Sequence, residues 1–349
     1  MFYIILLPFF TAFIIVLLST PSFIRVAHYK HLFDSPDEDR KIHKRSVPLM
    51  GGIMIFAGTV FAALFWYPSP YIGFVKFLIP SLLVLFFIGI KDDIIGTAPM
   101  KKLLAQILVA FIMVFVAKIR ITGMHGLFGV EQIPDWLSYA LSMFTYIVAI
   151  NAYNLIDGVD GLAGGVGFLA AFCLGLWFYF TGDYTFAVVS FSLAGALLAF
   201  LRFNFQPAQI FMGDSGSLTI GLLLIALTIA MIEQKTDYVG FAFMKDVSKP
   251  VLGMAVLAYP LIDTLRIFAY RAYKGLPPFQ ADQNHIHHRL IKMGLNHAQT
   301  VIAIILYNTL VISLVIIFRH LNPTVLFFAL FSFIVLSVLL LFSFKTKQN

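Results

Sequence analysis

Apolar stretches of about 20 residues recur along almost the whole chain and constrain its fold more than any other feature of the sequence. An α-helix needs about that many mostly apolar residues to cross the hydrocarbon core of a bilayer. The eleven stretches lie at residues 2–24, 50–67, 72–90, 103–117, 137–153, 163–181, 185–203, 216–232, 251–270, 300–318 and 325–344. The sequence therefore predicts an all-α polytopic membrane protein with about ten to eleven transmembrane helices, folded as one domain over residues 1–349.

Composition excludes the main alternatives to a membrane protein. Hydrophobic residues make up 60% of the chain and charged residues only 12%, whereas soluble proteins are about half apolar and a quarter charged. A disordered chain, a secreted disulfide scaffold and an ordinary cytosolic enzyme are thereby excluded. The single cysteine, Cys173, has no partner for an intrachain disulfide. The first stretch lacks the basic start and cleavage site of a signal peptide, so we expect it to be retained.

Lysine and arginine are divided unequally between the two sets of connecting segments. The richer set consists of residues 25–49, 91–102, 154–162, 204–215, 271–299 and the C-terminal tail. It holds 15 of the 24 basic residues, and the other set holds 6. Because basic residues concentrate in cytoplasmic loops, we expect the richer set to face the cytoplasm. The net charge of +7 is thus explained by sidedness, and no nucleic-acid partner is expected.

The first cytoplasmic segment is basic and ends in a glycine pair. Residues 40–52 run Arg-Lys-Ile-His-Lys-Arg-Ser-Val-Pro-Leu-Met-Gly-Gly and include Lys44. Glycines permit close backbone approach and a helix N-terminus offers free N–H groups, so the segment suits a bound anion. The alternative is a juxtamembrane stretch that contacts anionic lipid headgroups.

Directly after the apolar stretch 72–90, Lys91 is followed by two adjacent carboxylates, Asp92 and Asp93. They repel each other unless a cation or basic group lies nearby. Ionisable groups at the membrane are candidates for a functional site. The alternative is the start of a solvated loop.

Two later cytoplasmic segments combine acidic residues with glycines. In the first, Asn154 precedes Asp157 and Asp160, which are three residues apart and face the same way on a helix or a tight turn. In the second, Asn204 is followed by Asp214, which stands between glycines. A carboxylate there suits Mg²⁺, which takes few protein ligands and fills its shell with water and substrate phosphate. The alternative for Asp214 is a helix N-cap.

The last cytoplasmic segment carries three histidines and an arginine within five positions. Residues 285–289 run His-Ile-His-His-Arg, and we single out His287, His288 and Arg289. One interpretation is a zinc site, which the absence of a nearby cysteine disfavours. Another is a clamp for phosphates, in which Arg289 supplies a fork of hydrogen bonds. A third is an amphipathic turn at the membrane interface.

Metal-binding acids and anion-binding bases on one membrane face indicate a charged, soluble substrate. Phosphoryl transfer fits this combination because it depends mainly on positioning and charge neutralisation. A second substrate that is a lipid explains why such an enzyme is embedded in a membrane.

The ordered set of motifs from Arg40 to Gln299 resembles the polyprenyl-phosphate N-acetylhexosamine-1-phosphate transferase family, glycosyltransferase family 4. The pattern of residues 285–289 is most similar to the branch that uses UDP-N-acetylglucosamine (UDP-GlcNAc) and undecaprenyl phosphate. The resemblance implies a multi-pass protein of the bacterial inner membrane with catalytic cytoplasmic loops. It also allows a homodimer.

The resemblance implies a role for each candidate residue. Asp92 and Asp93 correspond to a catalytic acidic pair that acts on the lipid phosphate, and Asp214 and Asp157 to the Mg²⁺ region. The residues expected to bind the substrates are Lys44, Asn154, Asp160, Asn204, His287, His288 and Arg289. Relatives often carry a third acidic residue where this chain has Gly96, so a three-carboxylate site is not expected.

The implied reaction transfers N-acetylhexosamine 1-phosphate, most consistently GlcNAc 1-phosphate, from a UDP-sugar to undecaprenyl phosphate. It needs Mg²⁺ and yields UMP and a lipid-linked sugar diphosphate, the first step of a cell-surface polysaccharide pathway such as that of lipopolysaccharide. Direct attack and an aspartyl-phosphate intermediate both stay open. The rival interpretation is a transporter with an ion-coupled polar site, which would place charges near span midplanes.

Overall fold

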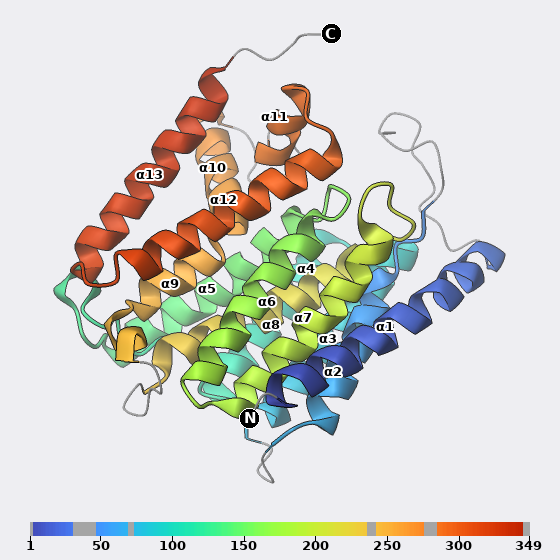
Figure 1. Cartoon of the computed structure of the whole chain (residues 1–349), viewed down its shortest axis with the longest axis horizontal. Coiled ribbons are helices and arrows are strands. Elements are labelled where there is room, and N and C mark those ends of the chain that lie inside the picture. Colours follow the sequence, from blue (N-terminus) through green and yellow to red (C-terminus); the bar gives the residue numbers. More distant parts are fainter. Residues whose placement is uncertain (1–2, 31–46, 69–72, 236–241, 276–284, 345–349) are drawn as a thin grey trace.

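The computed structural model describes residues 3–30, 47–68, 73–235, 242–275 and 285–344. Within these residues the regular elements are helices, without a strand, and they form one bundle with α1 (Tyr3–Tyr29) and α13 (Pro323–Ser343) at opposite edges (Figure 1). The elements between them are α2 (Gly51–Phe65), α3 (Val75–Ile95), α4 (Pro99–Phe111), η1 (Ile112–Val116), η2 (Leu127–Gly129), α5 (Asp135–Leu155), α6 (Leu162–Phe180), α7 (Tyr184–Asn204), α8 (Gly213–Glu233), η3 (Ala242–Asp246), α9 (Lys249–Val256), α10 (Ala258–Lys274), α11 (Ile286–Lys292) and α12 (His297–Ile317).

Each of the eleven predicted apolar stretches coincides with one helix or with two consecutive helices. Seven described helices are long and apolar enough to cross a membrane, and the bent pair α9–α10 brings the number to eight. The other three stretches form α2, which has only 15 residues, and α3 and α5, which have 21 residues each. The predicted all-α, multi-pass architecture is confirmed.

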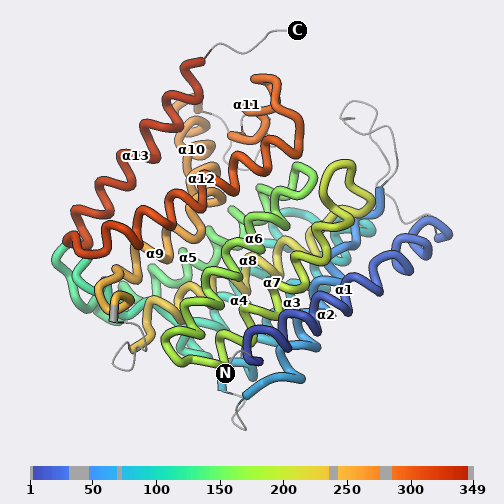
Figure 2. Tube along the Cα trace, in the orientation of Figure 1, coloured from blue at the N-terminus to red at the C-terminus, as the bar shows by residue number. Residues whose placement is uncertain are grey.

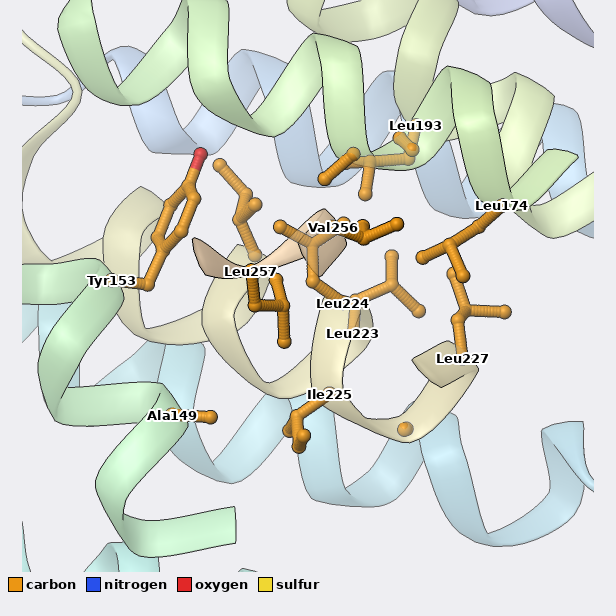
Figure 3. Close-up of a cluster of buried hydrophobic side chains, with 14 of the residues drawn as sticks. Ala149, Tyr153, Leu174, Leu193, Leu223, Leu224, Ile225, Leu227, Val256 and Leu257 are labelled. Carbon is orange, nitrogen blue, oxygen red and sulfur yellow. The ribbon is translucent and has the colours of Figure 1, made fainter. Parts of the chain in front are cut away.

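The helix α8 lies at the centre of the bundle. Of an apolar stretch of 18 residues within α8, 94% is buried inside the protein. Figure 3 shows leucines of α8 pointing to several sides and meeting side chains of the helices around it. By contrast, only 11% of an apolar stretch of 18 residues within α13 is buried, although α13 has the higher mean hydropathy, 3.0 against 2.1 for α8. In a bilayer a helix that is apolar all round is stable either in the protein core or facing lipid.

Glycines allow α2 and α3 to pack directly on the first turn of α8. A Cβ atom on Gly52 would lie 2.1 Å from the backbone nitrogen of Gly216, and one on Gly89 would lie 2.4 Å from Cα of Ser215. Only a residue without a side chain permits backbones to approach this closely. This packing places the C-terminal end of α3 beside the N-terminus of α8.

The predicted span at residues 251–270 is broken into α9 and α10, which meet at an angle of 75°. Pro260 has no N–H group to donate to the carbonyl of Val256, so one hydrogen bond of a continuous helix is missing at this point. Asn308 of α12 replaces the missing bond, since it donates to Val256 O at 3.3 Å and accepts from Tyr259 N at 3.2 Å. Figure 2 shows α10 turning away from α9 toward α11.

Candidate active site

Carboxylates from segments far apart in the chain meet at the N-terminus of α8. Lys102 of α4 lies between them, with Nζ 2.6 Å from Asp92 Oδ2 and 2.6 Å from Asp214 Oδ2. The two carboxylate oxygens are therefore separated by no more than twice that distance. The Asp92 and Asp214 side chains stay 19% and 21% exposed, so a ligand can reach them.

Lys102 is not among the residues that the sequence motifs predicted for the site. A lysine just before an apolar stretch is common at membrane surfaces. The available signal was its position on the same predicted face as Asp92, ten residues further along the chain.

The adjacent residues Asp92 and Asp93 have different surroundings. Asp93 accepts hydrogen bonds from the backbone N–H groups of Asp214 and Ser215, at 2.7 Å and 3.1 Å. These groups belong to the first turn of α8, where helix N–H groups have no partner within the helix. Asp93 thus caps α8 from a neighbouring helix, while Asp92 contacts Lys102.

The segment between α5 and α6 adds two polar groups to this cluster. Asn154 donates to Asp214 Oδ1 at 3.1 Å and to Ser217 Oγ at 2.7 Å, which fixes the orientation of the Asp214 carboxylate. Asp157 accepts a hydrogen bond from the backbone of Gly213. Burial raises the pKa of Asp157 well above its usual range, and the nearby charges of Asp214 and Asp93 raise it further. A bound cation would relieve this repulsion.

Asp160 and Asn204 connect two loops to each other. Asn204 accepts from Gly161 N and donates to Ile210 O, both at 2.9 Å, and Asp160 accepts from Ala208 N at 3.1 Å. Each of the two side chains is only 3% exposed. In this arrangement they hold the loops that carry Asp157 and Asp214, and their predicted contact with substrate stays a prediction.

We expect Asn204→Ala to destabilise the fold by about 2 kcal/mol, because it leaves a buried N–H and a buried carbonyl without partners. Thermal unfolding in detergent measures this loss. Gln209→Ala, at an exposed position of the same loop, is the control and should change stability by less than about 0.5 kcal/mol. Equal melting temperatures for the two variants would contradict the assigned role.

The basic segment is only partly visible, since Lys44 lies outside the described residues. At the start of α2, the N–H groups of Gly51 and Gly52 donate to the carbonyls of Phe211 and Met212, at 2.9 Å and 2.8 Å. These two groups are therefore engaged by protein and are not offered to an anion. The glycine pair connects α2 to the loop before α8.

The histidine turn, residues 285–289, packs against the segment that carries Asp157. A Cβ atom on Gly158 would lie 3.7 Å from Nε2 of His287. Burial is the main cause that lowers the pKa of His287 to about 3, so its imidazole is neutral at physiological pH. Burial also lowers the pKa of His288, which is partly exposed.

Asp263, His285 and His287 offer ligand atoms that all lie within 4.8 Å of one another, an arrangement that could hold a metal ion. However, Nδ1 of His285 and Oδ2 of Asp263 are hydrogen-bonded to each other at 2.6 Å. The same two atoms cannot bond to each other and ligate zinc. A metal ion bound at these two atoms would therefore have to replace the proton between them.

Arg289 belongs to α11, and its side chain contacts the C-terminal end of α13. Its guanidinium donates to the backbone carbonyls of Phe342, at 3.1 Å, and of Phe344, and it stacks on the Phe342 ring at 5.3 Å. Such bonds satisfy carbonyls that have no partner within the helix. Both bonds use Nη2, so a contact of Arg289 with a diphosphate would have to come from its other N–H groups or replace these bonds.

We expect Arg289→Ala to loosen the C-terminal end of α13, because this helix has little other protein contact. Hydrogen exchange at residues 340–344 should become at least about tenfold faster, the effect of losing about 1.4 kcal/mol of local stability. Lys292→Ala, at an exposed position of α11, is the control. Unchanged exchange together with a raised KM for the UDP-sugar would instead place Arg289 on the substrate.

Comparison with known proteins identifies the family. Residues 74–232 match glycosyl transferase family 4. Over 314 residues the chain is 30% identical to the undecaprenyl-phosphate alpha-N-acetylglucosaminyl 1-phosphate transferase of Escherichia coli strain K12, covering 88% of this chain and 82% of that relative. The chain belongs to glycosyl transferase family 4. The resemblance inferred from the sequence motifs is confirmed.

Other members of family 4 are similar over most of this chain. The chain is 31% identical to the Salmonella typhi undecaprenyl-phosphate alpha-N-acetylglucosaminyl 1-phosphate transferase, over 79% of this chain and 73% of that relative. It is 35% identical to the decaprenyl-phosphate N-acetylglucosaminephosphotransferase of Mycolicibacterium smegmatis, over 77% and 71% respectively. The family 4 match runs from α3 through α8, so it contains the acidic cluster and ends before the histidine turn.

Proposed function

We propose that this family 4 protein transfers GlcNAc 1-phosphate from UDP-GlcNAc to undecaprenyl phosphate and releases UMP. The printed names of the relatives support the polyprenyl-phosphate acceptor and the N-acetylglucosamine phosphate that is transferred. The observation that carries the proposal is the Asp92–Lys102–Asp214 cluster at the N-terminus of α8. It combines carboxylates that suit a hard cation with an ammonium group that suits a phosphate.

In the proposed reaction an oxygen of the lipid phosphate attacks the β-phosphorus of UDP-GlcNAc. A new P–O bond forms, and the bond between the β-phosphorus and the bridging oxygen breaks, so that the electron pair leaves with UMP. A phosphate monoester has its second pKa near about 6 and is already mostly a dianion at neutral pH. Asp92 is therefore proposed to orient the acceptor through Lys102, and proton removal is not its main task.

We propose that Asp214 and Asp157 hold Mg²⁺. The donor set fits this ion, since carboxylate oxygens are the hard ligands it prefers, and the ammonium of Lys102 already marks a cation position beside Asp214. When bound, the ion neutralises charge that develops on the diphosphate. Asn154 keeps Oδ1 of Asp214 engaged and so directs its other oxygen toward Lys102.

The location of the reaction is part of the proposal. The acidic cluster and the histidine turn belong to the set of connecting segments that together hold 15 of the 24 lysines and arginines, which supports an active face on the cytoplasmic side of a bacterial inner membrane. The product would begin a cell-surface polysaccharide such as lipopolysaccharide. A homodimer stays a prediction. The transporter alternative finds no support, because the similar proteins named above are transferases.

We expect the purified protein to release UMP from UDP-GlcNAc only when undecaprenyl phosphate and a divalent cation are both present. Excess EDTA should lower the rate by at least about a hundredfold, because the charge on the diphosphate is then unneutralised, and added Mg²⁺ should restore it. A coupled UMP assay measures both rates. UDP-N-acetylgalactosamine and UDP-glucose are the comparison donors. The proposal would be contradicted if UMP were released at the same rate without undecaprenyl phosphate, or if EDTA did not lower the rate.

A further inference from the structure

Two side chains of α10 contact the histidine turn, and the proposed function has assigned neither of them a role. Tyr259 and Asp263 are four residues apart and so lie on one face of the helix. The hydroxyl of Tyr259 lies 3.1 Å from Nδ1 of His287, and Oδ2 of Asp263 lies 2.6 Å from Nδ1 of His285. The two pairs connect one helix face to alternate residues of the turn.

Asp263 fixes the position at which α11 begins. Its second oxygen accepts a hydrogen bond from the backbone N–H of Ile286 at 2.8 Å, and Arg266 lies 4.0 Å away. The side chain is fully buried, at 0% exposure. A buried carboxylate persists only when partners of this kind surround it. Asp263 thus holds both the ring of His285 and the backbone of the next residue.

The contact between Tyr259 and Nδ1 of His287 bears on which nitrogen of the imidazole carries the proton. Its buried hydroxyl has a hydrogen-bond partner within the described residues in Nδ1 of His287, and a buried O–H group is satisfied when it donates. If Nδ1 accepts, the proton of the neutral ring lies on Nε2. Nε2 is the atom that faces Gly158, the residue after Asp157. His287 would then offer an N–H donor toward the acidic cluster.

The break between α9 and α10 makes these contacts available. The bend of 75° redirects α10, and the bonds from Asn308 to Val256 and Tyr259 keep the backbone satisfied at the bend. The rings of His285 and His287 are nearly parallel, with centroids 5.1 Å apart, so the two histidines pack on each other. The turn is therefore held by α10 at two points.

We propose that Tyr259 and Asp263 are positioning residues, which hold the histidine turn so that Nε2–H of His287 points at the diphosphate of the UDP-sugar. The inference rests on the proposed function. It assigns to the bent helix pair α9–α10 the task of orienting a neutral donor over the segment that carries Asp157. Neither residue contacts the reacting atoms.

The kinetic test uses Tyr259→Phe and Asp263→Asn in the full-length protein. Each should lower kcat for UDP-GlcNAc by about tenfold to a hundredfold, as loss of an orienting partner does elsewhere. The KM for undecaprenyl phosphate should not change, because the proposal places the turn at the UDP-sugar and not at the lipid. Tyr307→Phe is the matched control, since the hydroxyl of Tyr307 bonds to Ser337 on α13 at 2.6 Å. Wild-type kcat in Tyr259→Phe would overturn the proposal.

A spectroscopic test does not depend on turnover. In protein labelled with ¹⁵N-histidine, the signals of His287, assigned by their loss in His287→Gln, should show a protonated Nε2 and an unprotonated Nδ1. In Tyr259→Phe we expect a mixture of the Nε2-protonated and Nδ1-protonated forms of His287. In Tyr307→Phe we expect only the Nε2-protonated form. A His287 ring protonated on Nδ1 in the wild type, or one zinc ion per chain by elemental analysis, would overturn the positioning role. A wild type with the expected tautomer but no UMP release would instead refute the proposed function.

Discussion

Asp214→Asn should lower UMP release by at least about a hundredfold, the size of effect seen when one preorganised electrostatic contact is removed. The substitution removes the negative charge while keeping one oxygen acceptor for Asn154. The fold should be retained, because the loss of one of several neighbouring carboxylates relieves repulsion. Initial rates measured across a range of Mg²⁺ concentrations give the effect, and the melting temperature tests the fold.

Asp135→Asn is the matched control for this substitution. Asp135 is 79% exposed and pairs with Arg120 at 2.8 Å. Its loss should alter neither the rate nor the Mg²⁺ requirement, since an exposed ion pair contributes little. Turnover of Asp214→Asn within about threefold of wild type would remove Asp214 from the metal site, because three-fold is well below the effect of one such contact.

Lys102→Met should change two quantities in opposite directions. The turnover number should fall by about a hundredfold, because the ammonium that approaches the phosphates is lost. The Mg²⁺ concentration for half-maximal rate should decrease, because Asp92 and Asp214 lose the cation that competes for them at 2.6 Å. Rates measured as a function of Mg²⁺ separate the two effects.

Lys101→Met is the control for Lys102→Met, because it removes a neighbouring lysine, whereas the ion pairs with Asp92 and Asp214 are made by Lys102. Lys101 precedes Lys102 and is exposed, and we expect its substitution to leave both quantities unchanged. If Lys102→Met raised the Mg²⁺ requirement, or left turnover at the wild-type value, the competition between Lys102 and the metal would be refuted.

The convergence of Asp92 and Asp214 could be predicted because each follows or precedes an apolar stretch on one predicted face. The different hydrogen-bond partners of Asp92 and Asp93 could not be predicted from the sequence. Asp92 and Asp93 are adjacent and chemically identical, and only the packing of α3 against α8 gives Asp93 the N–H groups of Asp214 and Ser215. Likewise, the sequence around Asn204, the last residue of α7, does not distinguish a side chain that binds a substrate from one that binds the backbone of neighbouring loops.

The break between α9 and α10 also escaped prediction, for a physical reason. Pro8 and Pro21 lie inside α1 and Pro80 lies inside α3 without dividing either helix, so a proline alone does not predict a break. The difference at Pro260 is the side chain of Asn308, which satisfies both backbone groups released by a bend. That side chain comes from α12, nearly fifty residues away.

The most direct test of the central claim is to locate the divalent cation. Mn²⁺ prefers oxygen ligands, as Mg²⁺ does, and it can be followed by electron paramagnetic resonance. In the presence of UDP-GlcNAc we predict one tightly bound Mn²⁺ per wild-type chain, without nitrogen coupling from histidine, and no binding at the same concentration in Asp214→Asn. Equal binding in the variant, or strong coupling to histidine nitrogen, would contradict a metal centre built by Asp214 at the N-terminus of α8.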